Sequence, residues 1–107
     1  MSDYSAPLDD IRFVLENVVD LAGLAKFDAY AHIDADTVQG VLEENARFME
    51  QLVAPLNRVG DVQHSRWEAG HVVTPDGFRE AYQQYVAAGW GAVPLPTDYG
   101  GGGFPWL

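Results

Sequence analysis

The sequence has no cysteine, few basic residues and no long apolar run. Without cysteine, the chain can form no disulfide, no thiolate metal site and no cysteine nucleophile. Six lysine and arginine residues stand against sixteen acidic ones, which gives a formal net charge of −10. Nucleic acids and anionic membranes are both bound through cationic side chains, so we expect neither as a partner. No apolar run approaches the roughly 20 residues of a membrane span.

The first residues show no targeting signal. Residues 1–7 include Asp3 and have neither the basic start nor the apolar stretch of a signal peptide. We therefore expect a cytoplasmic location. With 107 residues, 48% of them apolar, the composition is that of one globular domain with one modest core.

Apolar residues recur at three- and four-residue steps in three stretches, which is the pattern of amphipathic helices. The predicted fold is all-α, with main helices at about 8–19, 36–59 and 75–88. Residues 21–27 can add a short helical turn. Residues 66–73 have the pattern of a small hairpin, and a glycine- and proline-rich loop follows from residue 91.

The second helix has the clearest signals. Asp36 is followed three residues later by Gln39, which is the spacing of a capping box, so we expect Asp36 to be the N-cap. Pro55 removes a backbone hydrogen bond and should kink the helix near Gln51. Gly60 is expected to end it.

The third helix also carries start and stop signals. Thr74 is the expected N-cap, with Pro75 as the first helical residue. Gly89 is expected to stop the helix in a left-handed conformation. Several aromatic residues before and along this helix are expected to form core: Trp67, Phe78, Tyr82, Tyr85 and Trp90.

The glycine run Gly100–Gly103 is not a phosphate-binding loop. Such a loop needs G-x-x-x-x-G-K-[ST], and no lysine follows Gly103. Pro94 and Pro96 would break the strand that a dinucleotide-binding fingerprint requires upstream. A flexible turn between two elements is the better interpretation.

No group of residues predicts a metal or catalytic site. His32, His64 and His71 are too far apart in sequence to place two ligands on one helix face. Asp34 and Asp36 fit a solvated turn and a helix cap. The neighbouring acidic pairs Asp9/Asp10 and Glu43/Glu44 point about 100° apart on a helix. We therefore assign no catalytic, cofactor-binding or metal-ligating residue.

Four segments, taken in order, resemble the flavin-dependent acyl-CoA dehydrogenase family. Residues 89–105 resemble the family's stretch G-W … P-x-x-Y-G-G-x-G between two helices of its N-terminal domain. Residues 36–61, with A-P-L-N-x-x-G-D at 54–61, resemble its long early helix, and residues 73–78 with Tyr82 resemble the next one. The opening residues 4–15 are similar to the N-terminal extension of the branch that includes the 3-methylmercaptopropionyl-CoA dehydrogenases.

The resemblance implies an N-terminal fragment of a much longer enzyme. Residues 1–35 would be the N-terminal helical extension and residues 36–107 an incomplete N-terminal helical domain. In the family, a later glutamate removes the α-proton of an acyl-CoA and FAD accepts the β-hydride. No residue of this chain matches that glutamate or the FAD-contacting segments, so the chain alone is expected to hold no FAD and to be inactive. The implied partners are the remainder of the polypeptide, the acyl-CoA substrate and further copies in a homo-oligomer.

The end of the chain favours the same interpretation. Phe104, Trp106 and Leu107 would be exposed to water with nothing after them to pack on. We expect a chain cut within its domain, which alone is marginally stable or self-associates. Two alternatives stay open: a stand-alone acidic interaction module that docks through Phe104–Leu107, or a fragment of an acyl-CoA oxidase-like flavoprotein.

Overall fold

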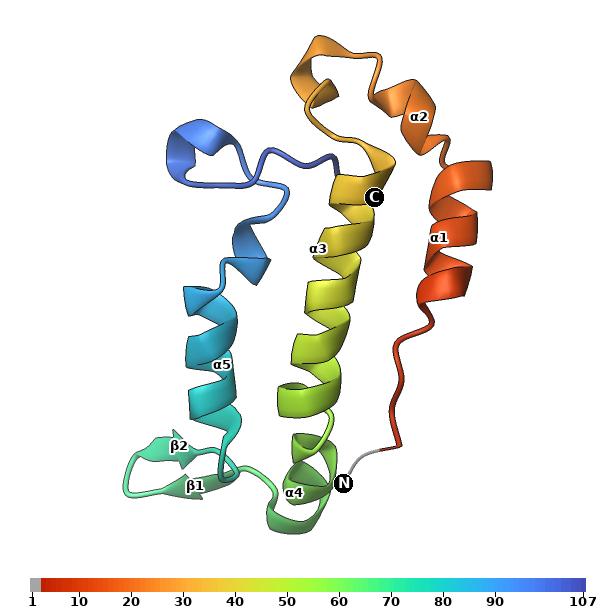
Figure 1. Ribbon diagram of the computed structural model, residues 1–107. Coiled ribbons are helices and arrows are strands. Elements are labelled where there is room, and N and C mark those ends of the chain that lie inside the picture. Colours follow the sequence, from red (N-terminus) through yellow and green to blue (C-terminus); the bar gives the residue numbers. More distant parts are fainter. Residues whose placement is uncertain (1–2) are drawn as a thin grey trace.

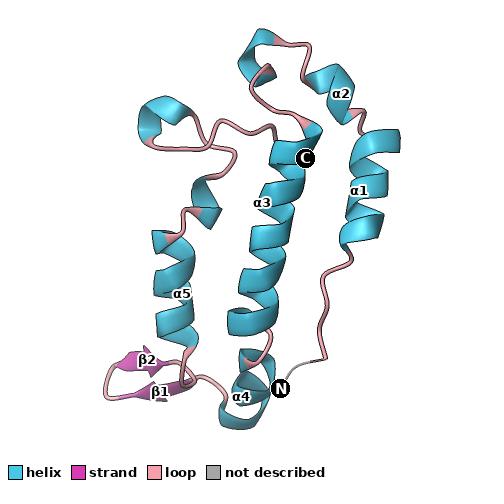
Figure 2. Cartoon of the chain, viewed as in Figure 1, coloured by secondary structure: helices cyan, strands magenta, loops and turns pink. Residues whose placement is uncertain are grey.

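Three helices lie side by side in one layer in the computed structural model, which describes residues 3–107 (Figure 1). They are α1 (Leu8–Asn17), α3 (Ala35–Phe48) and α5 (Phe78–Ala87). The short α2 (Leu21–Leu24) connects α1 to α3 at one end, and α4 (Leu56–Gln63) extends α3 at the other. The predicted all-α class is confirmed, and the predicted hairpin, β1 (Arg66–Glu68) with β2 (His71–Val73), is present (Figure 2).

The layer is thin for a chain of this length. Its extents are 53 × 34 × 18 Å and its radius of gyration is 17.2 Å. A compact domain of this length has a radius of gyration of about 13 Å. The accessible surface is 7828 Å², whereas a compact monomer of this mass exposes roughly 5,900 Å². Each helix therefore has neighbours within the layer, and much apolar surface on its faces has no cover.

The main core lies at the end of the layer where α2 is found. Leu21, Ile33 and Val38 are buried there, and Ile33 keeps only 2% of its surface exposed. Leu15 of α1 packs against this cluster, and so does Phe104 from the far end of the chain. The expectation that Phe104 is exposed to water is therefore wrong.

The start of α3 corrects the predicted cap. The helix begins at Ala35, and Asp34 is the N-cap: its carboxylate accepts the Thr37 N–H at 2.7 Å. Asp36 is the second residue of the helix, two positions beyond the cap, so it does not have that role. Gln39, the expected capping-box partner, accepts a hydrogen bond from Arg12 Nε at 3.0 Å instead and ties α1 to α3.

The predicted kink near Gln51 is confirmed as a π-helical turn, Met49–Val53, between α3 and α4. Pro55 has no N–H to give to the carbonyl of Gln51, four residues earlier. The N–H of Ala54 reaches one residue further back and donates to the Met49 carbonyl at 2.7 Å. The proline thus widens the helix without ending it.

The predicted stop at Gly60 is wrong, because α4 continues to Gln63. Gly60 serves close packing instead: a Cβ there would lie 2.7 Å from Cζ of Phe78. The helix ends at Gln63 because the next residue, His64, has a φ of 55°.

The predicted start of α5 at Thr74 and Pro75 is also wrong. The helix begins at Phe78, after Gly77 with φ 82°. A Cβ on Gly77 would lie 2.8 Å from Cδ2 of Leu56, so the turn before α5 packs closely on α4. The predicted left-handed stop at Gly89 is confirmed, with φ 79°.

The hairpin projects from the layer. Trp67 lies opposite Val72 in the antiparallel register, and their side chains are 72% and 62% exposed. The prediction that Trp67 forms core is wrong, because no described element covers it.

The glycine loop is closed by its own hydrogen bonds. Gly101, Gly102 and Gly103 donate to the carbonyls of Pro96, Ala92 and Leu95 at 2.9–3.1 Å. The segment predicted to be a flexible turn is thus a loop held by hydrogen bonds between its own backbone groups.

Candidate functional site

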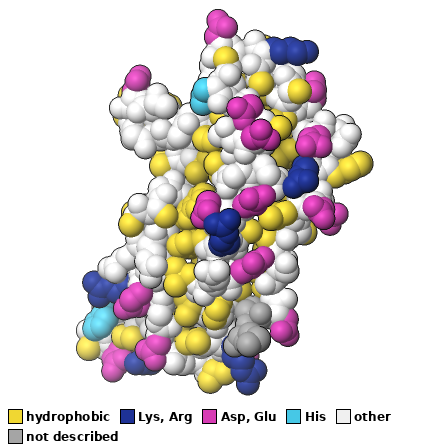
Figure 3. All heavy atoms as spheres, viewed as in Figure 1, with side chains coloured by type: hydrophobic (Ala, Val, Ile, Leu, Met, Phe, Trp, Pro, Cys, Tyr) yellow, Lys and Arg dark blue, Asp and Glu magenta, His cyan; other side chains and the backbone are white. Residues whose placement is uncertain are grey.

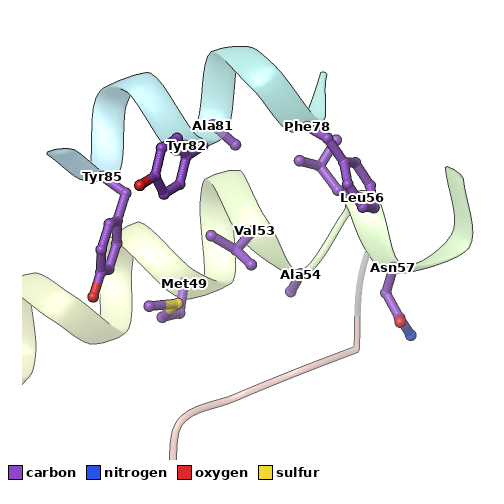
Figure 4. Close-up of a pocket in the computed structure, with 9 residues that line it drawn as sticks. All are labelled: Met49, Val53, Ala54, Leu56, Asn57, Phe78, Ala81, Tyr82 and Tyr85. Carbon is purple, nitrogen blue, oxygen red and sulfur yellow. The ribbon is translucent and has the colours of Figure 1, made fainter. Parts of the chain in front are cut away.

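A largely apolar groove lies between α5 and the stretch formed by the π turn and α4 (Figure 4). It encloses about 500 Å³. Its lining contains no charged side chain. The lining residues are Met49, Val53, Ala54, Leu56, Asn57, Phe78, Ala81, Tyr82 and Tyr85.

Helical spacing places these side chains on facing walls. Phe78, Ala81, Tyr82 and Tyr85 recur at the three- and four-residue steps that share one helix face. Figure 4 shows them above the π turn, with Met49 and Val53 pointing toward them. The groove therefore results from the π turn and the stripe of α5 together.

Aromatic contacts support one end of the groove. The Tyr82 and Tyr85 rings are stacked, with centroids 6.5 Å apart and planes at 17°. Phe48 lies 6.3 Å from both Tyr85 and Trp90, measured between ring centroids. The indole N–H of Trp90 is buried and has no hydrogen-bond partner. The rings of Phe48, Tyr82, Tyr85 and Trp90 therefore form one connected group.

The stripe of α5 is predicted to be core, and most of it is not. Only Ala81 is buried, whereas Tyr82 is 68% exposed and Val86 57% exposed. Periodicity identifies which face is apolar, but it does not say whether another element covers that face. In Figure 3, apolar side chains are visible in the space between α3 and α5. The two tyrosines are the signal that could have suggested an interface, since tyrosine suits surfaces that are part apolar and part wet.

The N-terminal segment lies beside the other side of the π turn. Tyr4 lies beside Met49 and Val53 in a smaller recess of about 250 Å³. The backbone N–H of Ala6 donates to Glu50 Oε1 at 2.8 Å and holds the N-terminal segment there.

The histidines and their acidic neighbours do not come together. Within residues 3–107, no three histidine or acidic side chains lie close enough to hold a metal ion. Hydrogen bonds from the Thr37 backbone and side chain, both to the carboxylate, lower the pKa of Asp34 below its usual 3.8. That shift belongs to a helix cap and does not indicate catalysis.

The acidic pairs lie on the surface of the helices. Glu43 accepts a hydrogen bond from Gln39 at 2.8 Å, and Glu44 pairs with Arg47. Asp9 and Asp10 are exposed in the first turn of α1.

No helix in the described part of the chain combines the length and the apolar character needed to cross a membrane.

Known proteins of one kind match the chain. It is 37% identical over 102 residues to the 3-methylmercaptopropionyl-CoA dehydrogenase of Ruegeria pomeroyi, over 95% of this chain and 17% of that enzyme. The homologues of this chain are acyl-CoA dehydrogenases. Two butyryl-CoA dehydrogenases of Syntrophomonas wolfei match at 24% and 27% identity, over 84% and 83% of this chain and 15% of each enzyme. No protein-family model matches the chain.

The similarity to acyl-CoA dehydrogenases extends over nearly the whole chain, so it includes more than the glycine loop. The resemblance predicted from four ordered segments is confirmed at the level of the family. The chain spans only 17% and 15% of the acyl-CoA dehydrogenases that it matches, which is consistent with an N-terminal fragment.

Proposed function

We propose that this chain is the N-terminal helical portion of a flavin-dependent acyl-CoA dehydrogenase. The observation that carries the proposal is its 37% identity, over 95% of the chain, to an enzyme of that kind. The thin helical layer with an open apolar face agrees with one part of a larger helical domain. In this proposal, residues 1–35 are the N-terminal extension and residues 36–107 belong to the helical domain.

The chemistry would reside in the rest of the polypeptide. When bound, FAD accepts the hydride taken from the β-carbon of the acyl chain. The glycine loop offers no amides to cradle the phosphates of FAD, because Gly101, Gly102 and Gly103 donate to carbonyls within their own loop. We therefore assign the FAD site and the catalytic base to the longer polypeptide, and to this chain one wall of the helical domain.

The substrate proposed for the longer polypeptide is an acyl-CoA thioester. The relatives are named for 3-methylmercaptopropionyl-CoA and butyryl-CoA, so these two thioesters are the first probes. We further propose that the longer polypeptide forms a homo-oligomer.

The proposal is tested on the protein in its source cells. An antibody against residues 3–17 captures the polypeptide, and mass spectrometry gives its intact mass. We expect a mass several times 11.8 kDa and a flavin absorbance that bleaches when one of the two thioesters is added without oxygen. A captured species of 11.8 kDa, or a longer polypeptide without flavin, would contradict the proposal. Rapid reoxidation by oxygen with release of hydrogen peroxide would assign an oxidase instead.

A further inference from the structure

An aspartate–glycine pair lies in the turn that leads into α5. The sequence has no asparagine–glycine pair, and Asp76–Gly77 is its one aspartate–glycine pair. Asp76 is exposed, and Gly77 has a left-handed φ of 82°. The turn borders a polar recess of about 350 Å³, whose lining includes Arg79 and Glu80. Water therefore has access to the Asp76 carboxylate.

The backbone nitrogen of Gly77 is free to react with that side chain. Among the described residues, the Gly77 N–H has no hydrogen-bond partner. Glycine also has no Cβ that would obstruct an approach to its nitrogen. The nearest electrophile along the chain is the carboxyl carbon of Asp76, and a bond between the two atoms would close a cyclic imide.

We infer that Asp76 is converted spontaneously to isoaspartate through this imide, and that Gln63 restrains the reaction. The Gly77 nitrogen bonds to Cγ of Asp76, the Cγ–O bond breaks, and the carboxyl hydroxyl leaves with the amide proton as water. Water then opens the imide. Attack at the original backbone carbonyl of Asp76 leaves the main chain running through Cβ and Cγ, so isoaspartate forms with no net change of mass.

Gln63 restrains the reaction through two hydrogen bonds to Asp76. Its Nε2 donates to the Asp76 carboxylate at 3.0 Å, and its Oε1 accepts the Asp76 N–H at 2.8 Å. Ring closure turns the carboxyl group toward Gly77 and removes one of its oxygens, so the bond to the carboxylate has to be given up. The restraint exists only in the folded chain, because Gln63 belongs to α4, thirteen residues earlier.

Isomerisation should loosen the contact between α4 and the start of α5. The inserted Cβ lengthens the main chain before Gly77, a residue so close to Leu56 that a Cβ on it would lie 2.8 Å from Cδ2. Both hydrogen bonds of Gln63 also depend on the original position of the Asp76 groups. We therefore expect the isomerised chain to unfold at a lower temperature. The inference is independent of the proposed function, because every residue that it uses lies in this chain.

Ageing of the purified 107-residue chain tests the inference. The chain is kept in neutral buffer below its thermal transition, and samples are digested with trypsin, which cleaves after Arg66 and Arg79. Asp76 is then the one aspartate of peptide 67–79, and Asp98, followed by tyrosine, is the one aspartate of peptide 80–107. Chromatography separates isomers of equal mass, and labelling by an isoaspartate-specific methyltransferase identifies isoaspartate. Asp98 is the internal control.

Isoaspartate should accumulate at residue 76 and not at residue 98. Gln63→Ala should react about three- to tenfold faster than the parent chain, the factor that corresponds to a hydrogen bond of ordinary net strength. Asp34→Ala is the matched control: it removes the cap at the other end of α3, so it should lower stability and keep the parent's rate. In urea, the parent and both variants should react at one rate.

The thermal midpoint links the modification to the fold. It should fall in the parent chain as the isoaspartate fraction grows. In Asp76→Glu, whose longer side chain cannot close the same imide, neither isoaspartate nor a falling midpoint should appear.

Three results would overturn the inference. The first is residue 76 unchanged in neutral buffer over a period in which the chain in urea has isomerised. The second is Gln63→Ala that reacts no faster than the parent. The third is Asp34→Ala accelerated as much as Gln63→Ala, because the reaction would then proceed from the unfolded chain and not from the turn.

Discussion

Gly101 lies directly against Leu95, so that a Cβ on this glycine would overlap the Leu95 carbonyl oxygen. The same loop is closed by the hydrogen bond from the Gly103 N–H to that carbonyl, at 2.9 Å. The glycine at position 101 is therefore required by contact with backbone, which cannot move aside like a flexible side chain.

Gly101→Ala should destabilise the chain, because the loop must open to admit the methyl group. We expect the free energy of unfolding to fall by about 1–3 kcal/mol, measured by urea denaturation followed by circular dichroism. Gly40→Ala is the control: Gly40 is exposed in α3, and a methyl group added there would meet nothing within 4 Å. That variant should gain about 0.5–1 kcal/mol through helix propensity. Equal effects of the two substitutions would contradict the close approach at Gly101.

Asp34 should make the stability of the chain depend on pH. Its pKa is lowered from 3.8 by the hydrogen bonds of Thr37, so the folded state favours the carboxylate. The resulting stabilisation is present above the usual pKa and is lost as the pH falls through the lowered one. Asp34→Ala should lower the thermal midpoint at neutral pH, and its difference from the parent chain should shrink toward about pH 3. Asp36→Ala should lower the thermal midpoint at neutral pH by less than Asp34→Ala does. A larger effect of Asp36→Ala would indicate that Asp36 is the N-cap.

Gln63 should hold the end of α4 to the turn before α5. Its Oε1 accepts the backbone N–H of Asp76 at 2.8 Å, and its Nε2 donates to the Asp76 carboxylate at 3.0 Å. Gln63→Ala removes both bonds at an exposed site, so we expect a loss of about 1 kcal/mol in urea denaturation. Gln83→Ala, on the exposed surface of α5, should change stability by less than about 0.5 kcal/mol. A negligible effect of Gln63→Ala would mean that the hydrogen bonds between Gln63 and Asp76 do not contribute to stability.

Local sequence signals predicted the structure correctly where the interacting residues lie within the same turn. The kink caused by Pro55 and the left-handed stop at Gly89 depend on their own turns, and both are confirmed. The predicted stop at Gly60 was wrong because that glycine leaves room for the ring of Phe78, eighteen residues away in sequence. The groove was missed for a related reason: the pattern of α5 defines an apolar face, but a single helix carries no information about what covers it.

The capping errors have a different origin. Asp34 and Asp36 are both good N-cap residues, and only backbone geometry decides between them. Asp34 has the extended conformation of a cap, with φ −115° and ψ 169°. The helix predicted to start at Pro75 starts at Phe78 instead. A turn that ends in Gly77 precedes it, and this turn packs closely on Leu56.

The uncovered layer should make the isolated chain weakly stable. Only six residues are buried among those described, Pro75 included, which is a small core for a domain of this length. We expect a thermal transition well below about 60 °C, or concentration-dependent association, in calorimetry and sedimentation. A sharp monomeric transition above that temperature would show that the layer needs no further cover.

The C-terminal residues should separate packing within the chain from docking on a partner. Phe104 packs on the cluster of Leu21, Ile33 and Val38, and its ring meets that of His32 edge-on at 6.4 Å. Trp106 is 79% exposed. Phe104→Ala should therefore cost about 1–3 kcal/mol in the isolated chain, less than for a fully buried phenylalanine. Trp106→Ala should change stability by less than about 0.5 kcal/mol.

The same pair of variants addresses the alternative of a stand-alone interaction module. If residues 104–107 were a docking tail, Phe104 would be available to a partner, and Phe104→Ala would leave the unfolding curve of the chain unchanged. The observed packing requires the opposite, because the phenyl ring fills space between α2 and the start of α3. A stability loss confined to Phe104→Ala would assign this ring to the fold, and leave only Trp106 and Leu107 for contact with anything outside it.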